Sequence, residues 1–61
     1  MSIEFLEDQG TYHGTDKRHR SWRISPTRTG WRLEFLDPGD VTHTNAGVFE
    51  SVKAAQAAAD R

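Results

Sequence analysis

The chain of 61 residues contains no cysteine, so disulfide bonds, thiolate zinc sites and a cysteine nucleophile are all excluded. A secreted domain of this size usually carries disulfides, and their absence therefore favours a cytoplasmic protein. No apolar run approaches the roughly 20 residues that span a bilayer. The acidic residues 1–8 also lack the basic start of a signal peptide. The sequence therefore predicts no membrane partner.

Apolar residues are few as well, at 34% of the chain. So short a chain hides only about 60% of its unfolded surface. Its apolar residues can fill one interface between a sheet and a helix, but they cannot also wall a ligand pocket of roughly 300 Å³ or more. We expect a single domain over residues 1–61 that is not an enzyme and takes no cofactor and no small-molecule substrate. The candidate core consists of Ile3, Phe5, Trp22, Ile24, Trp31, Leu33, Phe35, Val41, Val48, Phe49, Val52 and several alanines.

Two segments in the middle, residues 20–26 and 30–36, alternate apolar and polar side chains with the period of a half-buried strand. A turn over residues 27–30 joins them into a hairpin. The alternation predicts one register, because a shift by one residue would turn every apolar side chain to the other face. In that register Trp22 faces Phe35, Ile24 faces Leu33 and Pro26 faces Trp31, while Arg23 faces Glu34 and Ser25 faces Arg32 on the other side.

The sequence of the C-terminal half predicts a turn at residues 37–40, a third strand over about residues 41–49 and a helix over residues 51–60. Gly47 within the strand indicates either a bulge or a close approach of another backbone segment. Ser51 is a good N-cap, and the alanines form a face that can approach a sheet closely. Residues 3–7 read as a short strand, and residues 8–17 as a loop or a frayed strand pair, within a segment 1–19 that is partly flexible. The predicted fold class is α+β: an antiparallel sheet of three or four strands with one C-terminal helix packed on one face.

Charge is distributed unevenly although its sum is only −1. Residues 17–32 contain all six of the Lys and Arg residues that are candidates for contacting phosphate, and they contain no Asp or Glu. A surface that binds phosphate groups would have such an excess of positive charge. The alternative is a solvated loop, with Arg23 neutralised by Glu34. Trp22 and Trp31 could stack bases, but they alternate in phase with the apolar residues and are predicted to belong to the core. The candidate nucleic-acid contacts are Lys17, Arg18, Arg20, Arg23, Arg28 and Arg32.

The three histidines do not form a recognised site. His13, His19 and His43 show no metal-ligand spacing, and no nucleophile elbow accompanies them. The sequence predicts neither a metal site nor a catalytic triad.

A small sheet has a free edge, which can pair with a second copy or with another protein. Leu36 and Val41 flank the turn at residues 37–40 and are the candidate partner-binding residues. The alternative is a small cluster beneath the N-terminal segment.

Two resemblances add to these observations. The segments 22–26, 30–31 and 47–51, followed by alanine pairs at 54–55 and 58–59, resemble a family of short uncharacterised bacterial proteins. That family implies a strand, a Gly-Trp hairpin and an Ala-rich helix. The chain is more loosely similar to the DNA-binding domains of plant ethylene-response factors and phage integrases, in which the open face of a three-stranded sheet contacts DNA.

The sequence thus leads to two hypotheses. The first is a non-catalytic module that binds DNA or RNA through the arginine-bearing open face of the sheet. The second is a module for protein interaction or homodimerisation that uses a sheet edge.

Overall fold

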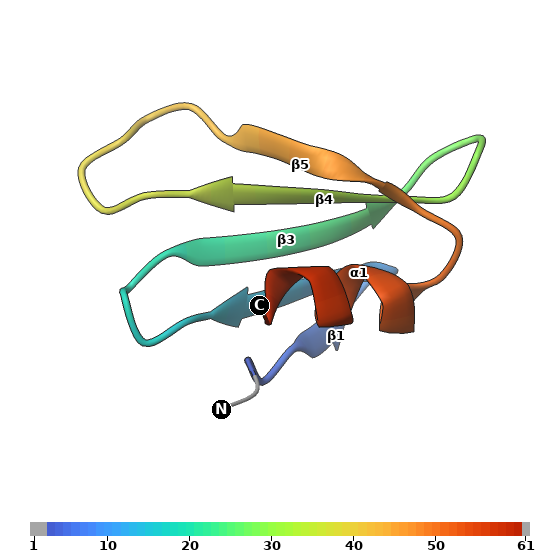
Figure 1. Ribbon diagram of the computed structural model, residues 1–61, viewed down its shortest axis with the longest axis horizontal. Helices are drawn as coiled ribbons and strands as arrows, with labels where there is room; N and C mark the ends of the chain where they lie inside the picture. Colours follow the sequence, from blue (N-terminus) through green and yellow to red (C-terminus); the bar gives the residue numbers. More distant parts are fainter. Residues whose placement is uncertain (1–2, 61) are drawn as a thin grey trace.

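The computed structural model describes residues 3–60, which form one antiparallel sheet and one helix (Figure 1). The strands follow one another across the sheet in chain order, and the helix packs on one face against β3, β4 and β5. The predicted α+β class is therefore confirmed. The elements are β1 (Leu6–Asp8), β2 (Thr11–Thr15), β3 (Ser21–Pro26), β4 (Trp31–Leu36), β5 (Thr44–Phe49) and α1 (Val52–Ala59).

The central hairpin has the predicted register, with Trp22 opposite Phe35, Ile24 opposite Leu33 and Arg23 opposite Glu34. Its turn is closed by the N–H of Thr27, which donates to the carbonyl of Gly30 at 2.7 Å. The hydroxyl of Thr27 also accepts hydrogen bonds from the turn's backbone. Local turn chemistry and the burial pattern therefore specify the same pairing.

The sheet has five strands rather than the predicted three or four, because residues 6–15 form a further hairpin. Its turn consists of Gln9 and Gly10, whose φ angles of 53° and 85° are both positive, as a two-residue hairpin turn requires. The segment lacks apolar alternation, and its strand character comes from pairing with β3. The predicted strand at residues 3–7 is also displaced, since β1 begins at Leu6.

The last strand begins at Thr44 instead of Val41, and the register shifts at Ala46, next to Gly47, so that the bulge is the one of the two predicted features that the structure has. Gly47 adopts a φ of 120°, and its N–H donates to Oδ1 of Asn45 at 2.8 Å. Two core predictions were wrong here, because Val41 is 95% and Val48 is 47% exposed. Val41 precedes the strand, and Val48 lies opposite Arg32 on the face away from the helix.

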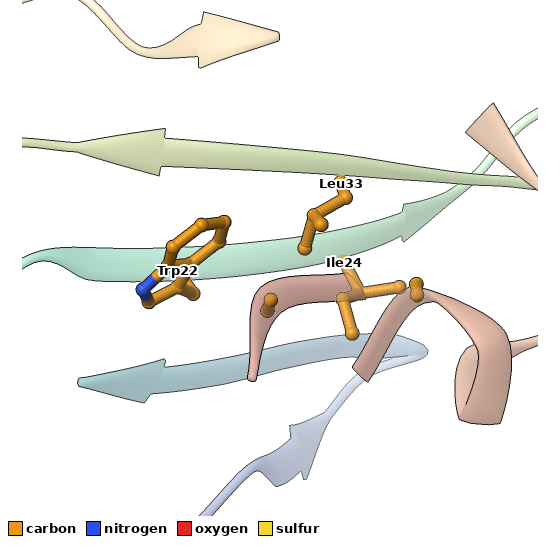
Figure 2. Packing of buried hydrophobic residues seen from close by; sticks show 5 residues of the cluster. Trp22, Ile24 and Leu33 are labelled. Atoms are coloured by element: carbon orange, nitrogen blue, oxygen red, sulfur yellow. The ribbon is translucent and has the colours of Figure 1, made fainter. Parts of the chain in front are cut away.

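The core lies between β3, β4 and α1 (Figure 2). Ile24 and Leu33 are fully buried, and Trp22 lies beside them. Ala55 and Ala59 are the buried residues of α1, and their small side chains let the helix sit close to the sheet. Ser51 caps the helix as predicted by accepting a hydrogen bond from the N–H of Ala54 at 3.0 Å. No helix within residues 3–60 is long and apolar enough to cross a membrane.

The segment before β1 closes one end of this core. Ile3 and Phe5 pack against the core cluster, and the N–H of Ile3 donates to Oδ1 of Asp60 at 3.2 Å. The segment passes so close to β2 that a Cβ atom at Gly14 would lie 2.9 Å from the carbonyl oxygen of Glu4. A glycine in β2 therefore makes room for the N-terminal segment.

Candidate nucleic-acid interface

The sheet has one face that α1 does not cover, which we call the open face. Strand registers place on it the residues that alternate with the core positions. No helix or strand of the part of the chain that the structure describes lies over this face (Figure 1). The open face consists of Leu6, Asp8, Thr11, His13, Thr15, Ser21, Arg23, Ser25, Arg32, Glu34, Leu36, Asn45 and Val48.

Near its centre lies the cross-strand pair Arg23 and Glu34. Nη2 of Arg23 donates to Oε1 of Glu34 at 2.9 Å, and Nε donates to the same oxygen at 3.3 Å. The Glu34 side chain is only 16% exposed, whereas that of Arg23 is 37% exposed. The pair fixes the position of one guanidinium group while cancelling its charge, and such partly exposed pairs contribute about 0.2–1 kcal/mol to stability.

Arg32 is the unpaired cation of the open face. It is exposed, lies between Ser25 and Val48 in the strand registers, and forms no ion pair within residues 3–60. It occupies the position diagonal to Arg23, which puts the two guanidinium groups on neighbouring strands. The five donors of a free guanidinium suit recognition of phosphate or of a base edge.

The structure does not gather all six basic candidates on one surface. Arg28 lies in the turn between β3 and β4, whereas Lys17 and Arg18 lie in the loop before β3, at the opposite end of that strand. Nε of Arg20 forms an ion pair with Asp37 at 2.8 Å, and its guanidinium lies 5.2 Å from the ring centre of Phe35, a core-face residue. Arg23 and Arg32 are thus the two candidates on the open face itself.

Lys17, Arg18 and Arg20 instead border a hollow of about 530 Å³ beside the C-terminal end of α1. Its wall includes Trp22 and Ala59 from the core and the carboxylates of Glu4, Asp16 and Asp60. Acidic and basic groups are equally numerous there, so the hollow has no excess positive charge. Charges also balance on the open face, where Asp8 and Glu34 match Arg23 and Arg32, but Arg32 forms no ion pair among the described residues.

The loop between β2 and β3 is organised by Asp16, a residue that sequence reasoning did not single out. Its carboxylate accepts hydrogen bonds from the backbone N–H groups of Arg18 and Arg20 at 2.8 and 2.9 Å, and from Nε1 of Trp22 at 3.0 Å. His19 in the same loop has a left-handed φ of 67°. The local signal for such a turn is an Asp whose side chain can accept a hydrogen bond from the backbone N–H two residues later, here that of Arg18.

The environment of Asp16 shifts its ionisation. Desolvation of the carboxylate opposes ionisation, but hydrogen bonds from Trp22, Arg20 and Arg18, together with the charge of Arg20, lower its pKa below the ordinary value of 3.8. Folding therefore gains stability from the ionised carboxylate above the unfolded-state pKa, and this gain is lost as the pH falls through the lowered folded-state value.

We accordingly expect the indole N–H resonance of Trp22 to move as the pH falls below about 3.8, together with the amides of Arg18 and Arg20. Proton–nitrogen correlation spectra over an acid titration measure these shifts. The variant Asp16→Asn keeps the size of the side chain but has no titrating group there, so the shifts should be missing from it. If these resonances shifted equally with pH in both proteins, the role assigned to Asp16 would be refuted.

All six aromatic residues of the chain lie on the helix side of the sheet or pack against the core. Trp22 is 7% exposed, which confirms the core prediction, and Trp31 is half-buried with its ring in edge-to-face contact with Tyr12. The open face therefore presents hydroxyl, imidazole, amide, guanidinium and carboxylate groups and the aliphatic side chains of Leu6, Leu36 and Val48, but no Phe, Tyr or Trp ring.

The remaining candidate residues lie apart from these cations. Leu36 is half-buried at the end of β4 on the open face, and Val41 is exposed in the loop that leads to β5. Among residues 3–60 no three side chains of His, Cys, Asp or Glu come together as metal ligands.

Comparison with protein-family models, with curated proteins and with solved structures gives no match to this chain. The resemblances drawn from the sequence therefore stay predictions.

Proposed function

We propose that this protein is a non-catalytic module that binds duplex DNA through the open face of its sheet. The observation that carries the proposal is an uncovered, mostly polar face of a five-stranded sheet, on which Arg32 is free and Arg23 is held in place by Glu34. Arg28, at the turn of the same hairpin, extends the set of cations beyond the end of the face.

The lack of aromatic side chains on the open face favours a duplex over a single strand. Proteins that bind single strands commonly stack bases on exposed aromatic side chains, and every Phe, Tyr and Trp ring here faces the helix or the core. Strands can enter the major groove of B-form DNA, which is about 12 Å wide. The major groove of an RNA duplex is too narrow for side chains to read. The proposed ligand is accordingly DNA.

The charge of the chain sets the expected strength of binding. Because the formal net charge is −1, long-range attraction to DNA contributes little. Contacts to phosphate come from the unpaired cations of the central hairpin, Arg28 and Arg32, because Glu34 cancels the charge of Arg23. With two phosphates neutralised, the logarithm of the binding constant should fall with the logarithm of salt concentration at a slope of roughly −1.8.

The test is fluorescence anisotropy of a labelled 20-base-pair duplex (about two turns) at low salt. The variant Arg32→Glu should weaken binding by tenfold or more, because it replaces the free cation of the open face by an anion. Lys53→Glu is the matched control, since it makes the same charge change at an exposed position of α1, on the other face of the sheet. Binding in Lys53→Glu should stay within about twofold of the parent protein.

Two results would contradict the proposal. One is the absence of duplex binding by the parent protein at low salt. The other is an equal loss of affinity in Arg32→Glu and Lys53→Glu, which would show that net charge alone, and not the open face, governs binding. A single strand of the same sequence should bind more weakly than the duplex.

A further inference from the structure

The two edges of the sheet differ in length and charge. β1, at one edge, has only three residues and includes Glu7 and Asp8. β5, at the other edge, has six residues, Thr44–Phe49, none of which is charged or a proline. Natural sheets commonly protect an edge by shortness, charge, proline or a bulge. β1 has two of these protections, whereas β5 has a bulge, which increases the local twist, but is neither short, charged nor interrupted by proline.

The β5 edge is also accessible along most of its length. Four of its residues, Thr44, Asn45, Ala46 and Val48, are exposed, and no strand in residues 3–60 pairs with its outer side. About half of the backbone N–H and C=O groups of an edge strand point outward, away from the neighbouring strand. These groups form a row of donors and acceptors that another strand can satisfy.

We propose that β5 pairs antiparallel with β5 of a second copy of this chain. Antiparallel pairing of two identical strands is self-complementary, so one two-fold axis satisfies both edges. The uncharged sequence of β5 puts no like charges opposite each other across that axis, whereas β1 paired with itself would bring acidic side chains together. The exposed side chain of Val48 in each copy would lie on the open face, beside the junction between the two β5 strands.

Such a dimer has a defined shape. A two-fold axis perpendicular to the sheet keeps both helices on one face and joins both open faces on the other. The pair of chains forms a continuous ten-stranded sheet, twice the five strands of one chain, with Arg23 and Arg32 repeated on either side of the axis. This pairing does not depend on DNA binding. If both occur, the dimer offers a two-fold symmetric face to a duplex.

The contact made by one six-residue strand is small, below the roughly 1,200 Å² of stable specific interfaces, so weak association is expected. Sedimentation equilibrium of the full chain between about 10 µM and 1 mM covers the affinities of weak complexes. The parent protein should be mostly monomeric at the low end and at least half dimeric at the high end. Amides of residues 44–49 should show concentration-dependent shifts.

The test variant is Val48→Glu, which places an acid on β5 of each copy and should lower dimer affinity tenfold or more. Leu6→Glu is the matched control, because Leu6 is an exposed apolar residue of the open face on the opposite edge. It should dimerise as the parent does. Circular dichroism of both variants verifies that they are folded.

A monomeric mass at 1 mM would overturn the proposal, and so would equal effects of the two substitutions. These outcomes are separate from the failure of DNA binding, since sedimentation is measured without DNA. Concentration-dependent shifts at β1 instead of β5 would show that the opposite edge is the contact.

Discussion

Gly30→Ala is expected to lower the melting temperature by roughly 12 °C or more, or to prevent folding. A Cβ atom at this position would collide with the carbonyl oxygen of Phe49, and the φ angle of 155° disfavours any side chain. Backbone strain and overpacking each cost about 1–3 kcal/mol, and about 3 kcal/mol in total is a large share of the roughly 3–9 kcal/mol expected for this length. In a domain of this size each kcal/mol lowers the melting temperature by about 4–8 °C.

Gly39→Ala is the matched control for this substitution. Gly39 also has a positive φ, 88°, but no atom lies within 4 Å of the position its Cβ would take. The substitution Gly39→Ala should therefore cost about 1 kcal/mol of stability, because alanine disfavours a positive φ. Thermal melts followed by circular dichroism compare the two variants. Equal melting temperatures would show that the approach of Phe49 to Gly30 does not determine the stability of this corner of the sheet.

Ile24→Ala is expected to destabilise the protein by about 2–5 kcal/mol. Ile24 is 0% exposed and lies in the core with Leu33 and Ala55, so its loss leaves a cavity that a small sheet with one short helix cannot close. Because the total stability of a chain of this length is of the same order, most molecules of the variant should be unfolded near 37 °C. Chemical denaturation at low temperature measures the free energy of unfolding.

The conservative change Ile24→Val removes one methyl group and should cost about 0.5–1.5 kcal/mol. The ratio of the two losses separates a packing effect from a general intolerance of substitution. If Ile24→Ala lost less than 1 kcal/mol, the helix would not be the element that seals this face. Val41→Ala, at a residue that is 95% exposed, should leave stability unchanged within about 0.5 kcal/mol.

Several parts of the molecule were predictable because neighbouring residues determine them. Alternation in residues 20–36 gives the strands and the register of the central hairpin, since only one pairing buries Ile24 against Leu33. The hydroxyl of Ser51 and the alanines after it give the helix and its start. The pairing of Arg23 with Glu34 follows from the same register.

Other features arise only from contacts between distant segments. The strand at residues 11–15 has no apolar alternation, and β3 supplies its pairing. Val48 resembles a core residue, but the bulge before it and the position of Phe49 turn it to the open face. The role of Asp16 depends on where the loop brings the indole of Trp22, and no local pattern encodes that distance.

The features of the candidate interface also fall into these two groups, those that the sequence determines and those that the tertiary structure decides. The sequence alone determined that the basic residues cluster between positions 17 and 32, and that Arg23 and Arg32 share a face. The tertiary structure decided that Arg20 is held by Asp37 and Phe35, that Lys17 and Arg18 lie at the helix side, and that β5 is the long uncharged edge. The reason is that strand periodicity is a local property, whereas the neighbours of a loop or an edge depend on how the whole chain folds.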